Sequence, residues 1–161
     1  MECPSCGGAL TLITETYEIP YFGMVLQSTF ICSCGYRFVD IFPFEEKIPM
    51  RYTLPVGRDA LCVRVVKSST CVIEIPELGV RVEPGPASEG IVTNIEGILR
   101  RVESALKTAI QWGDPDQKRK GKKILKNLWD VLEGNGVVTV ILEDPRGFSC
   151  IVSEKAVADT L

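Results

Sequence analysis

The chain has 161 residues, a length that suits one ordinary domain or one domain joined to a small metal-bound module. Hydrophobic residues make up 45% and charged residues 24% of it, with a formal net charge of −3, so the composition is globular and excludes a disordered chain. No apolar run approaches the length of a membrane span, and Met1 is not followed by a basic and apolar leader. We therefore expect a cytoplasmic protein with no membrane contact.

The sequence contains no histidine, which is the commonest general acid–base residue in enzymes. The two adjacent carboxylates Glu143 and Asp144 precede a turn signature, Asp144-Pro145-Arg146-Gly147. Neighbouring strand residues point to opposite faces, so these two carboxylates do not converge on one site. We predict that the protein is not an enzyme.

Seven cysteines, an odd number in a chain for which we expect no secretion, favour reduced thiols and metal ligation over disulfides. Cys3 and Cys6 form a C-x2-C pair, while Cys32 and Cys34 form a C-x-C pair that is one residue shorter than the usual knuckle. Four thiolates suit tetrahedral zinc and leave no position for water, which predicts one structural zinc ion. Four unmetallated thiols and iron in the same cage are the alternatives. The remaining cysteines are expected to be small buried residues: Cys62, Cys71 and Cys150.

The first 48 residues are predicted to form a zinc finger. Leu10 to Ile19 and Val25 to Ile31 have strand composition and are separated by turn residues, so we expect a hairpin with a metal knuckle at each base. The stretch from Ile41 to Pro49 is expected to be the linker to a second unit.

The second unit, residues 49–161, is predicted to be a β-meander, then a helix pair, then a β-hairpin. The meander strands are expected at Tyr52 to Val56, Leu61 to Val66, Cys71 to Ile75 and Val80 to Glu83. The hairpin strands are expected at Val137 to Leu142 and Phe148 to Val152.

Two helices are predicted between these β segments, over about residues 93–133. Thr93 and Glu96 fit a capping box at the start of the first helix, which is expected to end near Gly113. Asp114 followed by Pro115 is a typical start for the second helix. The short connection makes the two helices an antiparallel hairpin.

Several motifs, in order along nearly the whole chain, resemble the ZPR-type zinc-finger family in its single-copy, archaeal-like form. They are the two cysteine pairs, Ile19-Pro20-Tyr21-Phe22, Val65-Val66-Lys67-Ser68, Ile75-Pro76-Glu77-Leu78, Thr93-Asn94-Ile95-Glu96-Gly97 and Glu143-Asp144-Pro145-Arg146-Gly147. The resemblance implies a mainly β, α+β protein whose finger precedes a β-barrel-like domain with an inserted helical hairpin. It also implies binding of translation elongation factor one-alpha and assistance in its folding. The eukaryotic relatives are further associated with receptor tyrosine kinases, a contact not expected of an archaeal-like chain.

Two groups of residues are candidates for partner binding. Tyr21, Phe22 and Met24 lie at the tip of a hairpin too short to bury them, so we expect them to be partly exposed anchors, with folding of the tip back onto the second unit as the alternative. Lys120, Lys122 and Lys123 belong to a basic cluster at a helix start, where the helix dipole disfavours cations. An acidic surface or phosphates of a partner are the expected contact, and a solvated face is the alternative.

The sequence therefore predicts a zinc-binding protein that acts as a binding module or folding chaperone for a translation GTPase. A zinc-ribbon nucleic-acid-binding protein is the alternative function. Charge argues against it, because residues 1–48 hold six acidic side chains and two basic ones, a net of −4 that repels phosphates.

Overall fold

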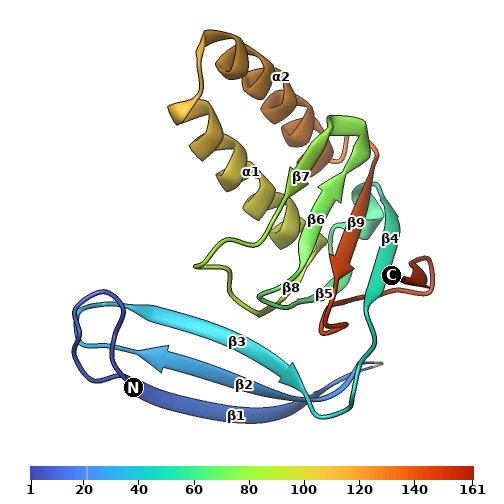
Figure 1. The fold of residues 1–161 in the computed structure, drawn as a ribbon. Coiled ribbons are helices and arrows are strands. Elements are labelled where there is room, and N and C mark those ends of the chain that lie inside the picture. The colour runs from blue at the N-terminus through green and yellow to red at the C-terminus, as the bar shows by residue number, and fades with distance from the viewer. Residues whose placement is uncertain (21) are drawn as a thin grey trace.

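The computed structural model describes residues 1–20 and 22–161, which form a finger, two further sheets and a pair of helices (Figure 1). The finger is an antiparallel sheet of β1 (Thr11–Ile19), β2 (Gly23–Ile31) and β3 (Arg37–Pro43), in that order. The predicted hairpin is confirmed, but Ile41 to Pro43 is strand and not linker. Pairing with β2 satisfies the β3 backbone and buries Ile41, which a free linker would leave in water.

The second unit contains two sheets. Its strands are β4 (Met50–Val56), β5 (Arg64–Lys67), β6 (Val72–Ile75), β7 (Val80–Val82), β8 (Ile91–Asn94), β9 (Val138–Asp144), β10 (Cys150–Val152) and β11 (Val157–Thr160). Short 3-10 turns, η1 (Arg58–Ala60) and η2 (Pro76–Leu78), interrupt the chain. One sheet has the order β11-β4-β9-β6-β7 and the other β10-β5-β8.

The predicted β-meander and the predicted C-terminal hairpin are both wrong. Among the described residues of the second unit, β6 and β7 are the one pair of consecutive strands that hydrogen-bond to each other. β9 pairs with β4 and β6, whereas β10 pairs with β5 in the other sheet. Sheets assembled from distant segments enclose a common core, which buries more apolar surface than a local ladder does.

The main core lies between these sheets and the first helix. Val138, Val140 and Leu142 point inward from β9 at alternate positions, as the two-residue period of a strand requires. They join buried residues of the smaller sheet and of the helices, among them Val65, Ile151, Ile98, Leu99, Val102 and Leu128. The expected β-rich domain with an inserted helical pair is thus present, with two open sheets in place of a closed barrel among the residues described.

The helices are α1 (Ile95–Trp112) and α2 (Pro115–Leu132), and they run side by side (Figure 1). The start of α2 is as predicted, since Asp114 caps it and exchanges hydrogen bonds of 2.8 and 2.9 Å with Gln117. The predicted Thr93 and Glu96 capping box is wrong. Thr93 pairs with Val65 in the sheet, and the Asn94 side chain caps α1 by accepting from the Gly97 amide at 2.8 Å. None of the described helices is both long and apolar enough to cross a membrane.

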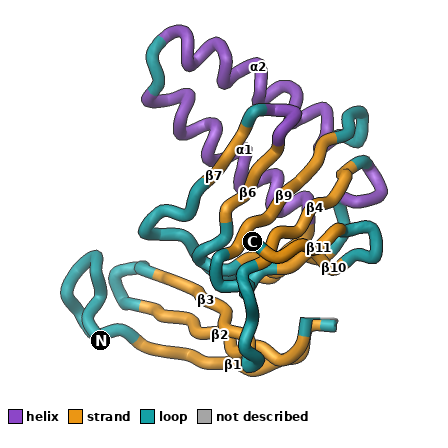
Figure 2. The backbone as a smooth tube through the Cα atoms, turned by 45° about the vertical axis from the view of Figure 1, so that its right-hand side comes forward, coloured by secondary structure: helices purple, strands orange, loops and turns teal. Residues whose placement is uncertain are grey.

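The finger packs against the second unit through β3 and through its tip. A second apolar cluster joins Ile19, Phe22, Val25 and Ile41 of the finger to Val66 and Cys150. The Gly90 amide donates to the Val39 carbonyl at 2.9 Å, and both views show β3 next to the body and β1 away from it (Figures 1 and 2). The boundary predicted at residue 48 stays a prediction.

Candidate metal centre and neighbouring surfaces

The far end of the finger brings four cysteine sulfurs together. Cys3 and Cys6 precede β1, and Cys32 and Cys34 lie between β2 and β3. The Sγ atoms of Cys3 and Cys34 are 3.7 Å apart, those of Cys6 and Cys32 are 3.5 Å apart, and all four lie within 4.8 Å of one another. Zinc–sulfur bonds of about 2.3 Å give a tetrahedron with edges of about 3.8 Å, so the donor set fits zinc.

Backbone hydrogen bonds hold both knuckles in this arrangement. The Gly7 amide donates to the Cys3 carbonyl at 2.8 Å, and the Gly35 amide donates to the Cys32 carbonyl at 3.0 Å. Gly7 and Gly35 have φ of +71° and +92°, a left-handed conformation that glycine adopts without strain. The shorter C-x-C pair therefore closes a turn of its own, and its length does not separate Cys34 from the other sulfurs.

The thiols differ in acidity. The Cys34 backbone amide and the neighbouring thiols lower the pKa of Cys32 to about 6. For Cys6, the Gly8 amide lowers the pKa, but hydrogen bonds to the other cysteines outweigh it and raise the pKa to about 12. A group of thiols with one easily ionised member is suited to metal ligation, since the thiolate is the form that binds zinc.

Of the other cysteines, Cys71 and Cys150 are buried as predicted, and burial raises the pKa of each to about 12. Cys62 is exposed, so its predicted burial is wrong. It follows η1 in a turn at the surface, where its neighbours in the chain do not cover it.

The tip residues do not behave alike. Phe22 is only 7% exposed, so its predicted role as an exposed anchor is wrong; its ring packs in the second cluster, and Lys47 lies over it with Nζ 5.0 Å from the ring centre. Met24 is 44% exposed, as expected of an anchor. Tyr21 lies outside the described residues. The sequence analysis missed Phe44, which is 62% exposed and whose amide donates to the Met24 carbonyl at 3.0 Å.

Changing Phe22 to Ala is expected to destabilise the isolated protein by about 3 kcal/mol, because it empties a buried site between the finger and the second unit. Urea unfolding at saturating zinc measures this. Met24→Ala is the control, since its side chain is largely in solvent. Equal stability of the two variants would contradict the packing role of Phe22.

The predicted basic cluster lies on α2, with Lys120, Lys122 and Lys123 all exposed. None of the three takes part in an ion pair with another described residue, whereas the nearby Arg119 pairs with Asp116 at 2.9 Å. The cluster is thus a free positive surface, and α2 lies far from the β2–β3 turn and the N-terminus of the finger (Figure 1).

Glu143 and Asp144 point to opposite sides of β9, as predicted. Glu143 binds Arg51 and Arg81 at the surface. Asp144 is 1% exposed and accepts hydrogen bonds at 2.6 Å from the Ser68 and Ser149 hydroxyls. Thr70 and the Arg146 amide donate to its other oxygen at 2.8 and 2.9 Å. Two of the sequence motifs, Val65 to Ser68 and Glu143 to Gly147, therefore meet in one buried polar network.

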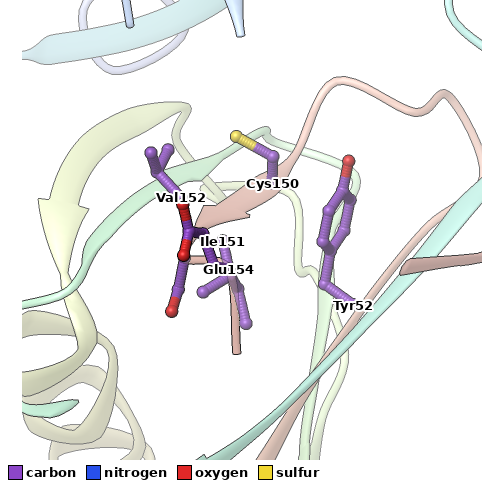
Figure 3. Close-up of a pocket in the computed structure, with 6 residues that line it drawn as sticks. Tyr52, Cys150, Ile151, Val152 and Glu154 are labelled. Carbon is purple, nitrogen blue, oxygen red and sulfur yellow. The ribbon is translucent and has the colours of Figure 1, made fainter. Parts of the chain in front are cut away.

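A cavity of about 330 Å³ lies beside β10, where Tyr52, Cys150, Val152 and Glu154 contribute to its lining (Figure 3). Burial raises the pKa of both Tyr52 and Cys150. Their hydroxyl and thiol are thus protonated at neutral pH, and neither is an activated nucleophile.

A four-cysteine finger attached to a two-sheet domain with a helical pair defines a small zinc-finger protein. A family model described as the ZPR1 jelly-roll domain matches residues 59–160. An uncharacterised ZPR1-like protein of Methanocaldococcus jannaschii is 43% identical, over 96% of this chain and 80% of its own length. A second, from Pyrococcus horikoshii, is also 43% identical, over 96% of this chain and 73% of its own length.

The chain belongs to the ZPR1 family. The fission yeast protein named zinc finger chaperone zpr1 is 34% identical over 89% of this chain, which spans 33% of that relative's length. The human zinc finger protein ZPR1 is 30% identical over 98% of this chain and 36% of its own length. The family and the four-cysteine cluster together make zinc the cofactor of this protein.

Proposed function

We propose that this protein is a cytoplasmic, non-catalytic binding module that assists the folding of a translation GTPase resembling elongation factor one-alpha. The observation that carries the proposal is the finger, which is pinned at one end by four cysteines and packed into a core at the other. Along its length and at its tip it exposes large apolar side chains, including Leu12, Met24 and Phe44. A rigid support that presents such side chains is typical of a protein-binding surface.

The choice of a translation GTPase is supported by the family resemblance in the sequence motifs. A chaperone role agrees with the name of the fission yeast relative, zinc finger chaperone. The direct test is the binding of the purified elongation factor from the same organism to the zinc-loaded chain, and the yield of the denatured factor on refolding with and without it. If the factor does not bind and its refolding yield is not higher with the chain present, the proposal is overturned.

The basic cluster on α2 is expected to steer the partner. Changing Lys120, Lys122 and Lys123 to Glu should lower the association rate at low ionic strength at least tenfold, because opposite charges speed diffusional encounter. Stopped-flow mixing with the elongation factor measures the rate.

The control for this prediction changes the same number of exposed cations elsewhere, at Arg64, Arg101 and Lys155. An equal loss in both triple variants would mean that only net charge matters. Salt-sensitive binding of RNA by the wild type that disappears in the α2 variant, without any binding of the factor, would favour the nucleic-acid alternative.

A further inference from the structure

One face of the finger sheet carries seven apolar side chains that solvent reaches. Residues directly opposite each other in an antiparallel pair share a face of the sheet. The register aligns Leu12 with Phe30 and Phe38 in one row, and Leu26 with Phe42 in another. A polar row of Thr14, Ser28 and Asp40 lies between them on the same face, and its Ser28 and Asp40 are buried. Met24 follows on the same face, and Phe44 lies beside it. We call this surface the open face, and it consists of Leu12, Met24, Leu26, Phe30, Phe38, Phe42 and Phe44.

No side chain of the open face is buried. Leu12, Met24 and Phe44 are 45, 44 and 62% exposed, and the other four are partly exposed. Among the described residues, none of the seven belongs to either apolar core cluster. Phe148 and Arg146 contact the face at one end, where both stack against Phe42. The seven side chains thus form two partly exposed apolar patches on one sheet face, one on each side of the polar row, and exposed apolar patches in a folded protein mark an interaction site.

The opposite face of the same sheet is already in use in the half near the tip. Ile19, Val25 and Ile41, which lie on that side by the same register, pack on the second unit. The finger therefore packs on the second unit without using the open face. It is held flat and rigid by the cluster behind it and by the cysteines at its end, which lowers the entropy lost when a partner binds.

The finger also leaves one strand edge free. β3 lies against the body, whereas β1 lies on the far side and pairs only with β2 in the described part of the chain (Figure 2). An extended segment is the shape that fits beside such an edge, because its backbone continues the ladder and alternate side chains reach the open face.

Charge indicates the composition of that segment. The open-face positions of β1, β2 and β3 include no lysine or arginine, and Glu18, Glu45 and Glu46 are exposed around the tip. Arg146 is the one exposed cation stacked at its margin. A second copy of the chain is disfavoured, because two fingers of net charge −4 repel and paired β1 strands would bring the glutamates Glu15 and Glu18 of both copies together.

We infer that the open face and the β1 edge bind an extended apolar segment flanked by lysine or arginine, of the kind that an incompletely folded protein exposes. The inference rests on the proposed function as a protein-binding module and specifies where and what it binds. It does not depend on the partner being an elongation factor.

The test uses the full zinc-loaded chain and a fluorescein-labelled peptide of eleven residues, with alternating valine and threonine between two lysines at each end. Binding is measured by fluorescence anisotropy. The Leu12→Ser and Phe44→Ser double variant removes two exposed apolar groups from the open face and is expected to weaken binding at least tenfold.

The matched control is the Ile13→Ser and Ile48→Ser double variant. Ile13 is 45% exposed, like Leu12, but points to the opposite face, and Ile48 is 59% exposed in the linker outside the sheet. It is expected to bind like the wild type. Zinc content and melting temperature establish that both variants are folded. A peptide with serine in place of valine, or with glutamate in place of lysine, should not bind.

Three results would overturn the inference: no binding of the peptide by the wild type, equal binding by the two double variants, or a wild-type dimer that the Leu12→Ser and Phe44→Ser variant abolishes. The elongation factor separates this inference from the proposed function. If both double variants bind the factor like the wild type, the factor is the partner but the open face is not its site. If the wild type binds the peptide and not the factor, the open face stands and the proposed partner does not.

Discussion

Changing Cys34 to Ser is expected to remove the zinc ion and to unfold the knuckle end of the finger, while the two-sheet domain stays folded. Structural zinc contributes on the order of 10 kcal/mol to modules of this kind, which have little apolar core of their own. The knuckle end fits this description, because the first six residues of β1 are exposed on both faces of the strand.

The tip of the finger should respond less than its knuckle end. Val25 and Ile41 are buried against Val66 and Cys150, so the second cluster holds that end without metal. Hydrogen exchange should therefore show lost protection at the amides of Gly7 and Gly35, partial protection near Val25, and no change at Val140 in the main core.

The control is Cys62→Ser, which changes an exposed cysteine outside the cluster and should retain one zinc per chain. Metal analysis and hydrogen exchange are compared across the three proteins. Full zinc content in Cys34→Ser, or unchanged protection at Gly7 and Gly35 after the metal is lost, would contradict the structural role of the ion.

Changing Asp144 to Ala should lower the free energy of unfolding by about 4 kcal/mol at neutral pH. The substitution removes the acceptor for Ser68, Thr70 and Ser149, of which Ser68 and Ser149 are buried, and each buried donor left unsatisfied costs about 1–3 kcal/mol. Asp159→Ala is the control, since Asp159 is exposed on β11 and its side chain accepts no hydrogen bond from a described residue. Urea unfolding at saturating zinc measures both, and equal stability would contradict the network's role.

The same variant has a pH signature. Burial by itself would raise the pKa of Asp144, but hydrogen bonds from Ser149, Ser68, the Arg146 amide and Thr70 outweigh it and hold the pKa below its ordinary value. The stabilising effect of the carboxylate is therefore complete above the unfolded pKa of about 4 and is lost as the pH falls through the lower folded pKa. The difference between wild type and Asp144→Ala should shrink below about pH 4. A difference that stays constant from neutral pH down to this range would mean that the charge of Asp144 is not what stabilises the fold.

Features that depend on neighbouring residues were readable from the sequence. The cysteine pairs indicate a metal site because ligand type and spacing are local properties. Asp114 and Pro115 mark the start of α2 because a capping residue acts on the amides of the next turn. The alternating apolar positions of β9 indicate a strand with one buried face for the same reason.

Features that depend on distant residues were decided by tertiary structure. Strand composition does not say which partner a strand takes. The sequence therefore predicts a hairpin of β9 with β10, whereas β9 pairs with β4 and β6. The exposure of Phe22 could not be read from a short hairpin, because Val66 and Cys150, which cover it, come from the other unit. The open face is visible only in the register of the three strands. Apolar residues at alternate positions of a strand predict a buried face, and only the tertiary packing shows that this face of the finger sheet is left uncovered.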